Sequence, residues 1–325
     1  MSSTERVRVS DPAHTVIVPA YNAEGTIEQA IRSVQAQTTS SFEVIAVDDG
    51  SRDATPELLE RMAGDDDRIT VVRQRNAGPS AARNAAIGRA AGDYLTFLDS
   101  DDLLMPPYLE TMAAAFAREP RVGLAHARAW VLDEAAGGGR VRREIWPPPG
   151  YVTGSSAEPA EPAEAVVALA SGNYVGAVQT ASRAALERAG DLDDDLHQAE
   201  DYDLWVRIAI AGFRVVAAPG TLAVIRNRPG SLSKDELELT RGVRSVCERL
   251  LSVYDVSDQA RAAAAGQLRV ADRQIELLSG GAPGRAALRR MRLALGRIKR
   301  RVLAGRLWYR EPPPEVAEAF PELVG

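Results

Sequence analysis

The chain has 325 residues, with 39 Lys or Arg and 45 Asp or Glu, which gives a formal net charge of −6. This acidic balance argues against general nucleic-acid binding. The single cysteine excludes an internal disulfide and a thiolate zinc site, and three scattered histidines argue against a histidine metal cluster. No apolar run reaches the roughly 18 residues of a membrane span, and the charged N-terminus lacks a signal-peptide core, so we expect a cytoplasmic protein.

Strands and helices are predicted to alternate in the first part of the chain. Short β-branched or apolar runs predict strands at residues 15–19, 42–47, 69–72 and 94–98. Helical spacing of apolar residues predicts helices at 24–37, 53–63 and 80–91 between them. This order favours an α/β fold with a mostly parallel sheet flanked by helices.

The second part of the chain is less regular. The pattern predicts a helix from residue 106 to about 118, a strand at 122–132, a Gly- and Pro-rich loop at 134–162 and a short helix at 163–171. A helix at 199–211 and a strand at 213–218 follow, and residues 234 to about 278 are predicted to be helical. We therefore expect two regions, residues 1–233 and a C-terminal helical region at 234–325.

Polar motifs follow the predicted strands at their carboxyl ends, where parallel sheets bind ligands. Asp99-Ser100-Asp101-Asp102 is the most informative, because neighbouring carboxylates repel one another unless a cation lies between them. Oxygen ligands of this kind suit Mg²⁺ or Mn²⁺. The alternative is that Asp102 caps a helix that begins at Leu103.

Five motifs, in this order, resemble those of the inverting family 2 glycosyltransferases with the GT-A fold. The resemblance covers residues 14–233 and implies a Rossmann-like catalytic domain at 1–233 that binds a nucleotide sugar. The matching residues are Val16 to Asn22, Val47 to Asp53, Asn76-Ala77-Gly78 with Ala82-Arg83-Asn84, Leu98 to Asp102, and Glu200 to Trp205 followed by Pro229 to Ser233.

The resemblance implies a donor site at the strand ends. Its residues are Pro19, Ala20, Tyr21, Asn22, Asp48, Asp49, Asn76, Arg83, Asp99, Ser100 and Arg228. Tyr21 would pack on the base or ribose, although the residues alone favour an ordinary strand-end turn here. Asp48 or Asp49 would accept a hydrogen bond from the base, with helix capping as the alternative. Arg83 would approach the nucleotide, and otherwise is a surface arginine.

The resemblance also assigns the chemistry. Asp101 would hold a divalent metal, Mn²⁺ or Mg²⁺, on the donor diphosphate, and Asp99 would contact the ribose or complete the metal's shell. Asp201, next to Glu200, would act as general base toward the acceptor hydroxyl, so the product is inverted. Capping of the helix start is the alternative role for this acidic pair.

One departure from the family pattern concerns Arg228. The family often has a histidine just before the Pro-Gly-Ser-x-Ser stretch, and this chain has an arginine. A guanidinium cannot ligate a metal, but it can bind a diphosphate directly. The sequence therefore predicts a diphosphate site whose metal coordination differs from the family pattern.

Acceptor contacts are expected at Trp146, Asn173 and Trp205, with Tyr174 and Gln179 as further candidates, because aromatic rings stack on sugar faces. Residues 285–310 are basic, contain no acid and place apolar residues on one helical face. Such a helix rests on an anionic membrane, packs on the catalytic domain or forms a homodimer. The first alternative makes the protein peripheral at the inner membrane face.

The sequence thus predicts a metal-dependent inverting transferase that uses a nucleotide-diphosphate sugar, with UDP-sugars favoured. The acceptor is a saccharide, a lipid-linked sugar or a small molecule. Two alternatives stay open, a sugar-phosphate nucleotidyltransferase and a non-catalytic nucleotide-sugar-binding scaffold. The first normally has a glycine-rich loop after its first strand, whereas this chain has only Gly25 there. The second has no need of Asp201.

Overall fold

The computed structural model describes residues 12–134, 140–143, 160–176, 178–196, 198–228, 235–280, 308–309 and 314–321. Strands and helices alternate in the N-terminal half, as the sequence predicts. In chain order these elements are β1 (His14–Ala20), α1 (Ile27–Gln35), β2 (Phe42–Asp48), α2 (Thr55–Asp65), β3 (Ile69–Arg73), α3 (Pro79–Ile87) and β4 (Tyr94–Phe97).

The later elements add further strands to the same sheet, and the helices α8 and α9 follow β9. They are β5 (Leu103–Leu104), α4 (Tyr108–Arg118), β6 (Val122–Asp133), β7 (Arg140–Arg143), α5 (Pro162–Ala170), β8 (Gln179–Ser182), α6 (Arg183–Ala189), α7 (Glu200–Ile210), β9 (Arg214–Asn227), α8 (Glu236–Ser252), α9 (Asp258–Ser279), β10 (Trp308–Tyr309) and α11 (Pro314–Ala319). None of the helices in the described ranges has the length and apolar character needed to cross a membrane.

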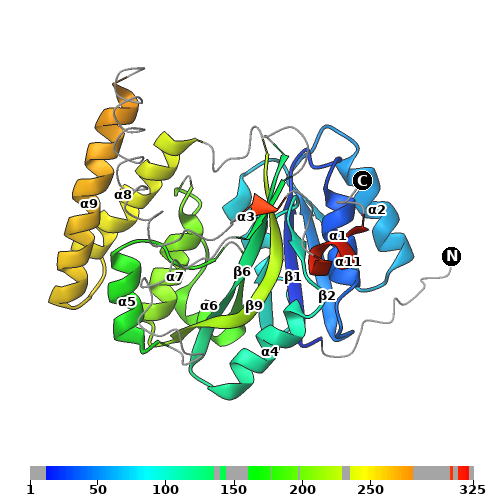
Figure 1. Ribbon diagram of the computed structural model, residues 1–325, viewed down its shortest axis with the longest axis horizontal. Coiled ribbons are helices and arrows are strands. Elements are labelled where there is room, and N and C mark those ends of the chain that lie inside the picture. Colours follow the sequence, from blue (N-terminus) through cyan, green and yellow to red (C-terminus); the bar gives the residue numbers. More distant parts are fainter. Residues whose placement is uncertain are drawn as a thin grey trace.

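The described strands form one ten-stranded mixed sheet, with the order β10-β7-β6-β8-β4-β1-β2-β3 along its main path (Figure 1). Strands β3, β2, β1 and β4 are parallel neighbours, and β8 then pairs antiparallel with both β4 and β6. The parallel half carries the predicted motifs at its carboxyl edge. The GT-A architecture expected from the sequence is therefore the one observed.

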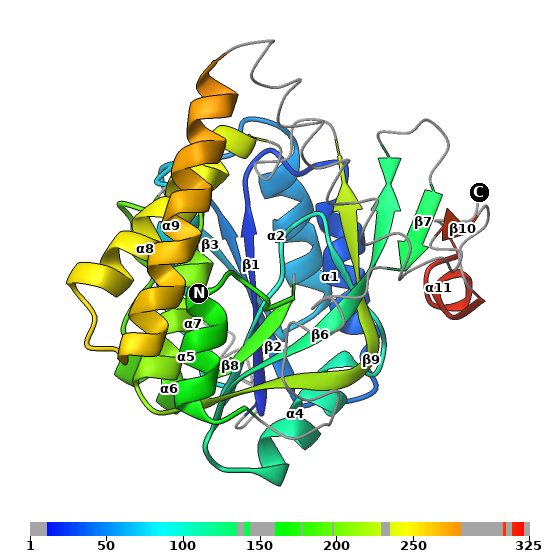
Figure 2. The same cartoon turned by 60° about the vertical axis from the view of Figure 1, so that its left-hand side comes forward.

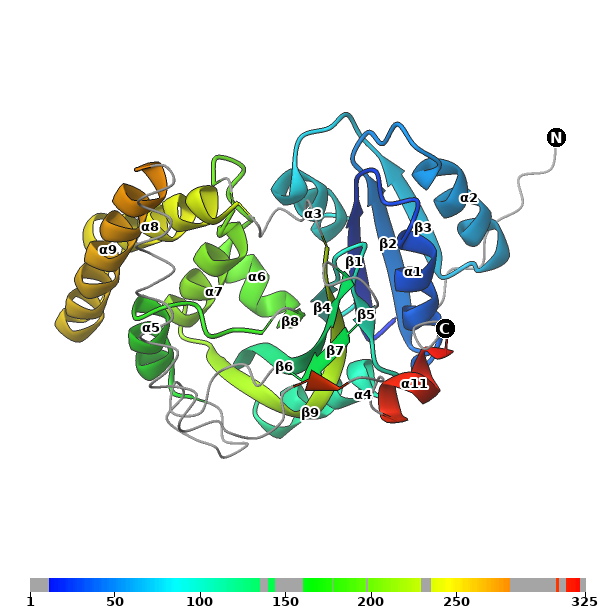
Figure 3. The same ribbon diagram turned by 45° about the horizontal axis from the view of Figure 1, so that its top comes forward.

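Helices cover both faces of the sheet because side chains along each strand alternate between them. Val16 and Val18 of β1 pack with α1, α2 and α4 on one face, whereas Ile17 packs with α3 and with α5 to α9 on the other. Figure 3 shows α1 and α2 on one side of β1 and β2, and α6 and α7 on the other side of the molecule. The second face carries α7, the helix that begins with Glu200 and Asp201.

The C-terminal helices pack against this second face. Helices α8 and α9 form a helical hairpin beside α5 and α7 (Figure 2). The buried cluster that contains Trp205 of α7 also contains Val246, Leu250, Ala260 and Ala264. Val316 of α11 and Phe320, just after its end, are buried against Trp130, Leu132 and Val224 of β6 and β9. Both parts of the C-terminal region thus contact the sheet-bearing part of the chain.

Several predicted elements differ from the structure. Asp102 does not cap a helix, because Leu103–Leu104 pairs with β9 as strand β5. Residues 234–278 do not form one continuous helix. Helix α8 ends at Ser252, and α9 begins at Asp258, where the Ser257 hydroxyl accepts a hydrogen bond from Ala260 N–H. β9 extends well beyond the strand predicted at 213–218.

Two further departures concern the long loop and the basic segment. The loop predicted at 134–162 contains strand β7, which pairs with β6. At the end of the basic segment 285–310, residues 308–309 are a strand that pairs with β7 rather than a helix. The rest of that segment lies outside the described residues, as does the predicted motif at 229–233.

Candidate active site

The first three strand ends are held together by backbone hydrogen bonds. Asp49 N–H donates to the Ala20 carbonyl at 2.8 Å, and Gln74 N–H donates to the Asp48 carbonyl at 3.0 Å. Gly50, at φ 76°, allows this close approach, because a Cβ there would lie 2.8 Å from the Asn76 nitrogen. The motifs at 19–22, 48–51 and 76–78 therefore share one edge of the sheet, as predicted.

Asn22 supports the loop, whereas Tyr21 faces solvent. The Asn22 side-chain oxygen accepts a hydrogen bond from Arg52 N–H at 2.9 Å, and Asn22 N–H donates to the Ser51 hydroxyl at 3.0 Å. The Tyr21 side chain is 48% exposed, so its ring is available to a ligand at the site entrance. Asn76 is exposed as well, while Ala20 is buried and Pro19 is partly buried.

The two acids after β2 have different environments. Asp49 accepts three hydrogen bonds, from Gln74 Nε2 at 2.8 Å and from Ala77 and Gly78 N–H at 2.9 Å each. Asp48 accepts a hydrogen bond from Ser51 N–H at 3.0 Å. Both are buried. Asp49 therefore holds the loop before α3 in place, and Asp48 is the acid with acceptor capacity left for a ligand.

We expect Asp49→Asn to destabilise the fold, since its amide would face a backbone N–H that the carboxylate now accepts. A buried donor left without an acceptor costs about 1–3 kcal/mol. Asp48→Asn is the matched control, because its remaining oxygen can still accept from Ser51 N–H. Urea unfolding should give the larger loss of stability for Asp49→Asn, and titration with UDP should give the larger loss of affinity for Asp48→Asn. The reverse pattern would contradict this assignment.

Arg83 joins two carboxylates from distant parts of the chain. Its Nη2 lies 2.8 Å from Asp99 Oδ1 and its Nη1 lies 2.7 Å from Glu200 Oε1. The guanidinium is 12% exposed. Burial opposes its charge, but the carboxylates of Asp99, Glu200 and Asp201 outweigh that effect and raise the pKa of Arg83. The alternative of an ordinary surface arginine does not fit this buried position, and the role of Arg83 toward a nucleotide stays a prediction.

Asp201 lies on a cavity that the donor motif and the α7 motif share. The cavity measures about 320 Å³, part of it open to solvent, and its lining residues are Arg83, Phe97, Asp99, Gln179, Leu192, Asp201 and Trp205. Burial and the neighbouring Glu200 carboxylate raise the pKa of Asp201 to about 6, against the lowering effect of Arg83. A carboxylate with a pKa near neutrality that faces a cavity is suited to take up a proton.

The carboxylates after β4 lie near one another and near the charge of Arg228. Asp101 and Ser100 are partly buried, and Asp99 is exposed. Burial and the Asp99 charge raise the pKa of Asp101, while Arg228 and Arg226 lower it. Arg228 is held by Glu134, with Nε 3.5 Å from Oε2. The structure thus places Arg228 close enough to Asp101 for their charges to interact.

The described residues hold no group of three or more His, Cys, Asp or Glu side chains arranged as a metal site. Two neighbouring carboxylates, Asp99 and Asp101, still fit a cation that also binds phosphate, because Mg²⁺ usually takes one or two protein carboxylates and completes its shell with phosphate oxygens and water. The mutual repulsion of the two acids is the feature that a cation would relieve.

The predicted acceptor residues are only partly brought together. Trp205 lines the cavity, but it is 1% exposed and packs edge-on against Phe97 with ring centroids 5.8 Å apart. It is therefore a wall of the site and not an open stacking platform. Asn173 accepts a hydrogen bond from Val175 N–H at 3.1 Å and does not line the cavity. Trp146 lies outside the described residues.

Sequence reasoning missed the part of the wall that Phe97 and Leu192 supply. Phe97 is simply the last residue of a buried strand, and Leu192 sits in a loop with no motif of its own. The signal for Leu192 is Asn84, whose side chain both donates to the Leu192 carbonyl at 2.9 Å and accepts from its N–H at 3.0 Å. An asparagine in the Ala-Arg-Asn motif thus carries a long-range contact that the sequence alone does not reveal.

Comparison with known proteins shows what the first half of the chain is similar to. The family model for glycosyl transferase family 2 matches residues 15–168. The first half of the chain is thus similar to a family 2 glycosyltransferase domain. The matched stretch of this domain contains Asp48, Arg83, Asp99 and Asp101 and ends within α5, before Glu200, Asp201 and Arg228.

Curated relatives each match about a third of this chain. Glycosyltransferase GlyA of Streptococcus pneumoniae is 42% identical over 102 residues, which is 31% of this chain and 15% of GlyA. Putative glycosyltransferase EpsH of Bacillus subtilis is 42% identical over 101 residues, or 31% of this chain and 29% of EpsH. Succinoglycan biosynthesis protein ExoO of Rhizobium meliloti is 45% identical over 102 residues, or 31% of this chain and 29% of ExoO. The chain thus spans less than a third of the length of each.

Solved structures extend the likeness of the fold beyond the family 2 match. Residues 1–349 of S. aureus TarS give a TM-score of 0.60 at 20% identity, over 79% of this chain and 71% of that one. The mannosyltransferase PcManGT of Pyrobaculum calidifontis, in complex with GDP-Man and Mn²⁺, gives a TM-score of 0.59 at 22% identity, over 88% of this chain and 81% of that one. These likenesses show that the fold is of the GT-A type.

Proposed function

We propose that this protein transfers a sugar from a nucleotide-diphosphate sugar, with UDP-sugars favoured, to an acceptor hydroxyl with inversion at the anomeric carbon. The observation that carries the proposal is the convergence on one cavity of Asp201, Arg83 and Asp99. Arg83 and Asp99 come from the family 2 stretch, whereas Asp201 comes from a helix outside it. A donor-site carboxylate and a candidate base are thus separated only by a small cavity.

On the donor side, we propose that Asp48 accepts a hydrogen bond from the base and that Tyr21 packs against it. Asp48 has acceptor capacity left, and the Tyr21 ring is exposed at the same edge. One form of TarS has been solved with UDP-GlcNAc, and PcManGT with GDP-Man. Both nucleotides therefore belong in the test, and preference for a uridine donor is the expected result.

We propose that Asp101 and Asp99 hold Mn²⁺ or Mg²⁺ against the donor diphosphate. The metal would supply positive charge where the leaving diphosphate becomes more negative. Arg228, which is held by Glu134 and lies close enough to Asp101 for their charges to interact, would bind the diphosphate from the protein side. Arg83 would keep Asp99 and Glu200 oriented toward the cavity.

For the transfer itself, we propose that Asp201 takes the proton of the acceptor hydroxyl. The acceptor oxygen then forms its bond to the anomeric carbon while the bond from that carbon to the diphosphate oxygen breaks, and the nucleoside diphosphate leaves. A single base on the face opposite the leaving group gives inversion. Glu200 donates no proton in this scheme, and its carboxylate raises the pKa of Asp201.

The test is a panel of UDP-glucose, UDP-N-acetylglucosamine and GDP-mannose, each with and without Mn²⁺, in which release of nucleoside diphosphate is measured. Water serves as the acceptor, so the natural acceptor is not needed. Release that requires Mn²⁺ supports the transferase. Binding of UDP without release from any donor would favour the non-catalytic scaffold, and formation of a nucleotide sugar from UTP and a sugar phosphate would favour the nucleotidyltransferase.

The pH dependence of turnover should report Asp201. Since only the ionised carboxylate accepts a proton, kcat/KM should fall as the pH drops below about 6, the pKa of Asp201. In Glu200→Gln the raising effect of the neighbouring charge is lost, so the acid limb should move to lower pH. Donor release measured between pH 5 and pH 9 checks both profiles, and an acid limb that stays in place in Glu200→Gln would contradict the assignment.

A further inference from the structure

Helix α8 lies against the turn that precedes the candidate base. At Gly242 of α8, a Cβ would overlap the carbonyl oxygen of Gln198 and lie 3.0 Å from Ala199 Cβ. The α8 backbone therefore approaches this turn as closely as a glycine permits. Ala199 is the residue directly before Glu200 and Asp201.

The turn itself has an uncommon backbone. Gln198 has φ 62° and Ala199 has φ 69°, and both are non-glycine residues in the left-handed region. Such conformations persist where the surrounding structure holds them. The contact with Gly242 is one such constraint, and it acts on the residues that set the direction in which α7 starts.

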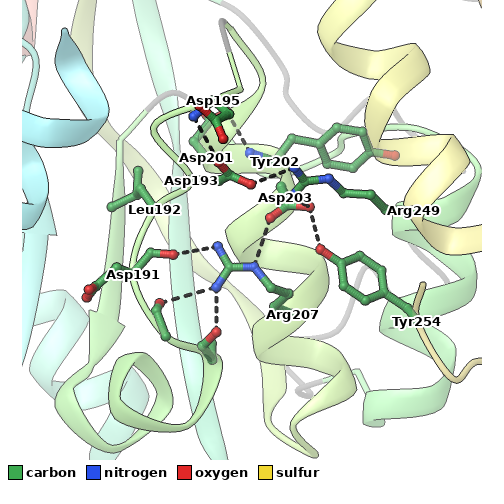
Figure 4. A network of polar contacts seen from close by, with 12 residues as sticks. Asp191, Leu192, Asp193, Asp195, Asp201, Tyr202, Asp203, Arg207, Arg249 and Tyr254 are labelled. Atoms are coloured by element: carbon green, nitrogen blue, oxygen red, sulfur yellow. Dashed lines mark hydrogen bonds and ion pairs between the residues drawn. The ribbon is translucent and has the colours of Figure 1, made fainter. Parts of the chain in front are cut away.

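The same helix makes a second, independent contact with α7 (Figure 4). Asp203 is fully buried, and its Oδ2 accepts from Arg207 Nε at 2.8 Å. Its Oδ1 accepts from the Tyr254 hydroxyl at 2.6 Å and lies 3.4 Å from Arg249 Nη1. Arg249 belongs to α8, and Tyr254 follows just after its end.

Arg249 also reaches the loop that forms the cavity wall. Its Nη2 lies 2.5 Å from Asp193 Oδ2, and Arg207 Nη2 donates to the Asp191 carbonyl at 2.8 Å. Leu192, which lines the cavity, is the residue between these two anchors. The loop at 191–195 is therefore held by Asn84 on one side and by the Asp203 network on the other.

We propose that α8 is a positioning element of the active site. Gly242 seats the turn before Asp201, and Arg249 holds the Leu192 loop against Asp203, so that base and cavity wall keep one fixed arrangement. This inference rests on the proposed function, whereas the contacts of α8 with the turn and the loop are observed independently of it. It makes the α8–α9 pair a working part of the catalytic unit and not an appendage.

Gly242→Ala tests the first contact, with Gly266→Ala in α9 as the matched control. Both are glycines inside helices, where alanine is normally the better helix former. A Cβ at 266 would meet only Arg269 Nη2, at 3.9 Å, whereas a Cβ at 242 would displace the turn. A displacement of about 1 Å at a reacting group can cost about 100-fold in rate. Gly242→Ala should therefore lower kcat for UDP release by about that factor, with donor KM and UDP affinity close to wild type.

Arg249→Met tests the second contact, with Arg244→Met as its control. Arg244 lies on the same helix and pairs with Asp272 and Glu248, each at 2.8 Å, away from the loop. Hydrogen–deuterium exchange should speed up at 190–196 in Arg249→Met and stay unchanged in Arg244→Met. Arg249→Lys, which keeps the charge, should restore part of the turnover that Arg249→Met loses.

The outcomes separate the two proposals. If wild type releases nucleotide from no donor, the proposed function fails, but exchange at 190–196 and 198–204 still decides whether α8 holds these segments. The positioning role is overturned if Gly242→Ala matches Gly266→Ala, and Arg249→Met matches Arg244→Met, in both turnover and exchange.

Discussion

Replacing Asp201 with asparagine should lower the rate of nucleotide release by about 10²–10⁴-fold, the contribution usual for a general base. Asparagine keeps the shape of the side chain and removes its ability to take a proton. The affinity for UDP with Mn²⁺ should stay within about twofold of wild type, because none of the proposed contacts with the nucleotide or the metal involves Asp201. Initial rates and calorimetric titration with UDP measure the two effects separately.

The same substitution should stabilise the protein at high pH. The folded-state pKa of Asp201 is raised to about 6 from a usual value of 3.8, so the ionised carboxylate is disfavoured by the fold. For such a group the cost is fully present above the folded pKa, shrinks as the pH falls through about 6 and vanishes below about 4. Asp201→Asn should therefore melt higher than wild type at pH 8, with a difference that disappears near pH 4.

A loss of activity together with a gain in stability would distinguish a functional acid from a structural one. A residue that only caps α7 would lower the melting temperature on substitution. Asp203→Asn provides the comparison and should destabilise the protein, because Asp203 is fully buried, accepts hydrogen bonds from Arg207 and Tyr254, and pairs with the charge of Arg249. If Asp201→Asn retains turnover, or loses stability at pH 8 as Asp203→Asn does, the assignment of the base is wrong.

The sequence predicted where the polar motifs of β1 to β4 lie because they follow strands that can be recognised locally. Each of β1 to β4 is a short apolar run with a polar motif at its end, and parallel pairing brings those ends to one edge. The pairing of Ala20 with Asp48 is one example. Knowledge of the strands was therefore enough to predict that these polar residues gather at one edge of the sheet.

The parts that the sequence did not predict depend on contacts between distant segments. The strand Gln179–Ser182 has only four residues, and it exists because both β4 and β6 pair with it. The bond between Arg249 and Asp193 joins positions 56 apart, and no local pattern marks either residue as a partner. The left-handed turn at Gln198 and Ala199 is likewise set by its surroundings and not by glycine.

Asp101→Asn should have the second large effect, on metal-dependent donor binding. Removing one carboxylate from a pair that would hold the cation should weaken Mn²⁺-dependent binding of UDP by about 100-fold or more, since even indirect partners of metal ligands contribute about 10–100-fold. Manganese electron paramagnetic resonance with UDP present measures the bound metal directly, and calorimetry measures UDP.

Asp102→Asn is the matched control for this substitution. Asp102 is adjacent in sequence but is buried, and its Oδ1 accepts from Arg226 N–H at 2.9 Å, a bond that asparagine can still accept. Asp101 and Asp102 are therefore chemically alike but differ in the direction in which their carboxylates point. Metal and UDP binding in Asp102→Asn should stay close to wild type.

UDP binding that does not depend on Mn²⁺ would assign the neutralisation of the diphosphate to Arg228 instead of a metal ion. If UDP binds equally well with and without Mn²⁺, and Asp101→Asn leaves that affinity intact, the diphosphate is held by protein cations. Arg228 is the candidate, because its charge acts on Asp101 and its side chain is 38% exposed while Glu134 orients it. Arg228→Ala should then remove most of the binding, whereas in a metal-dependent site it should weaken binding and leave the Mn²⁺ requirement in place. The two substitutions together thus decide which positive charge the leaving diphosphate meets.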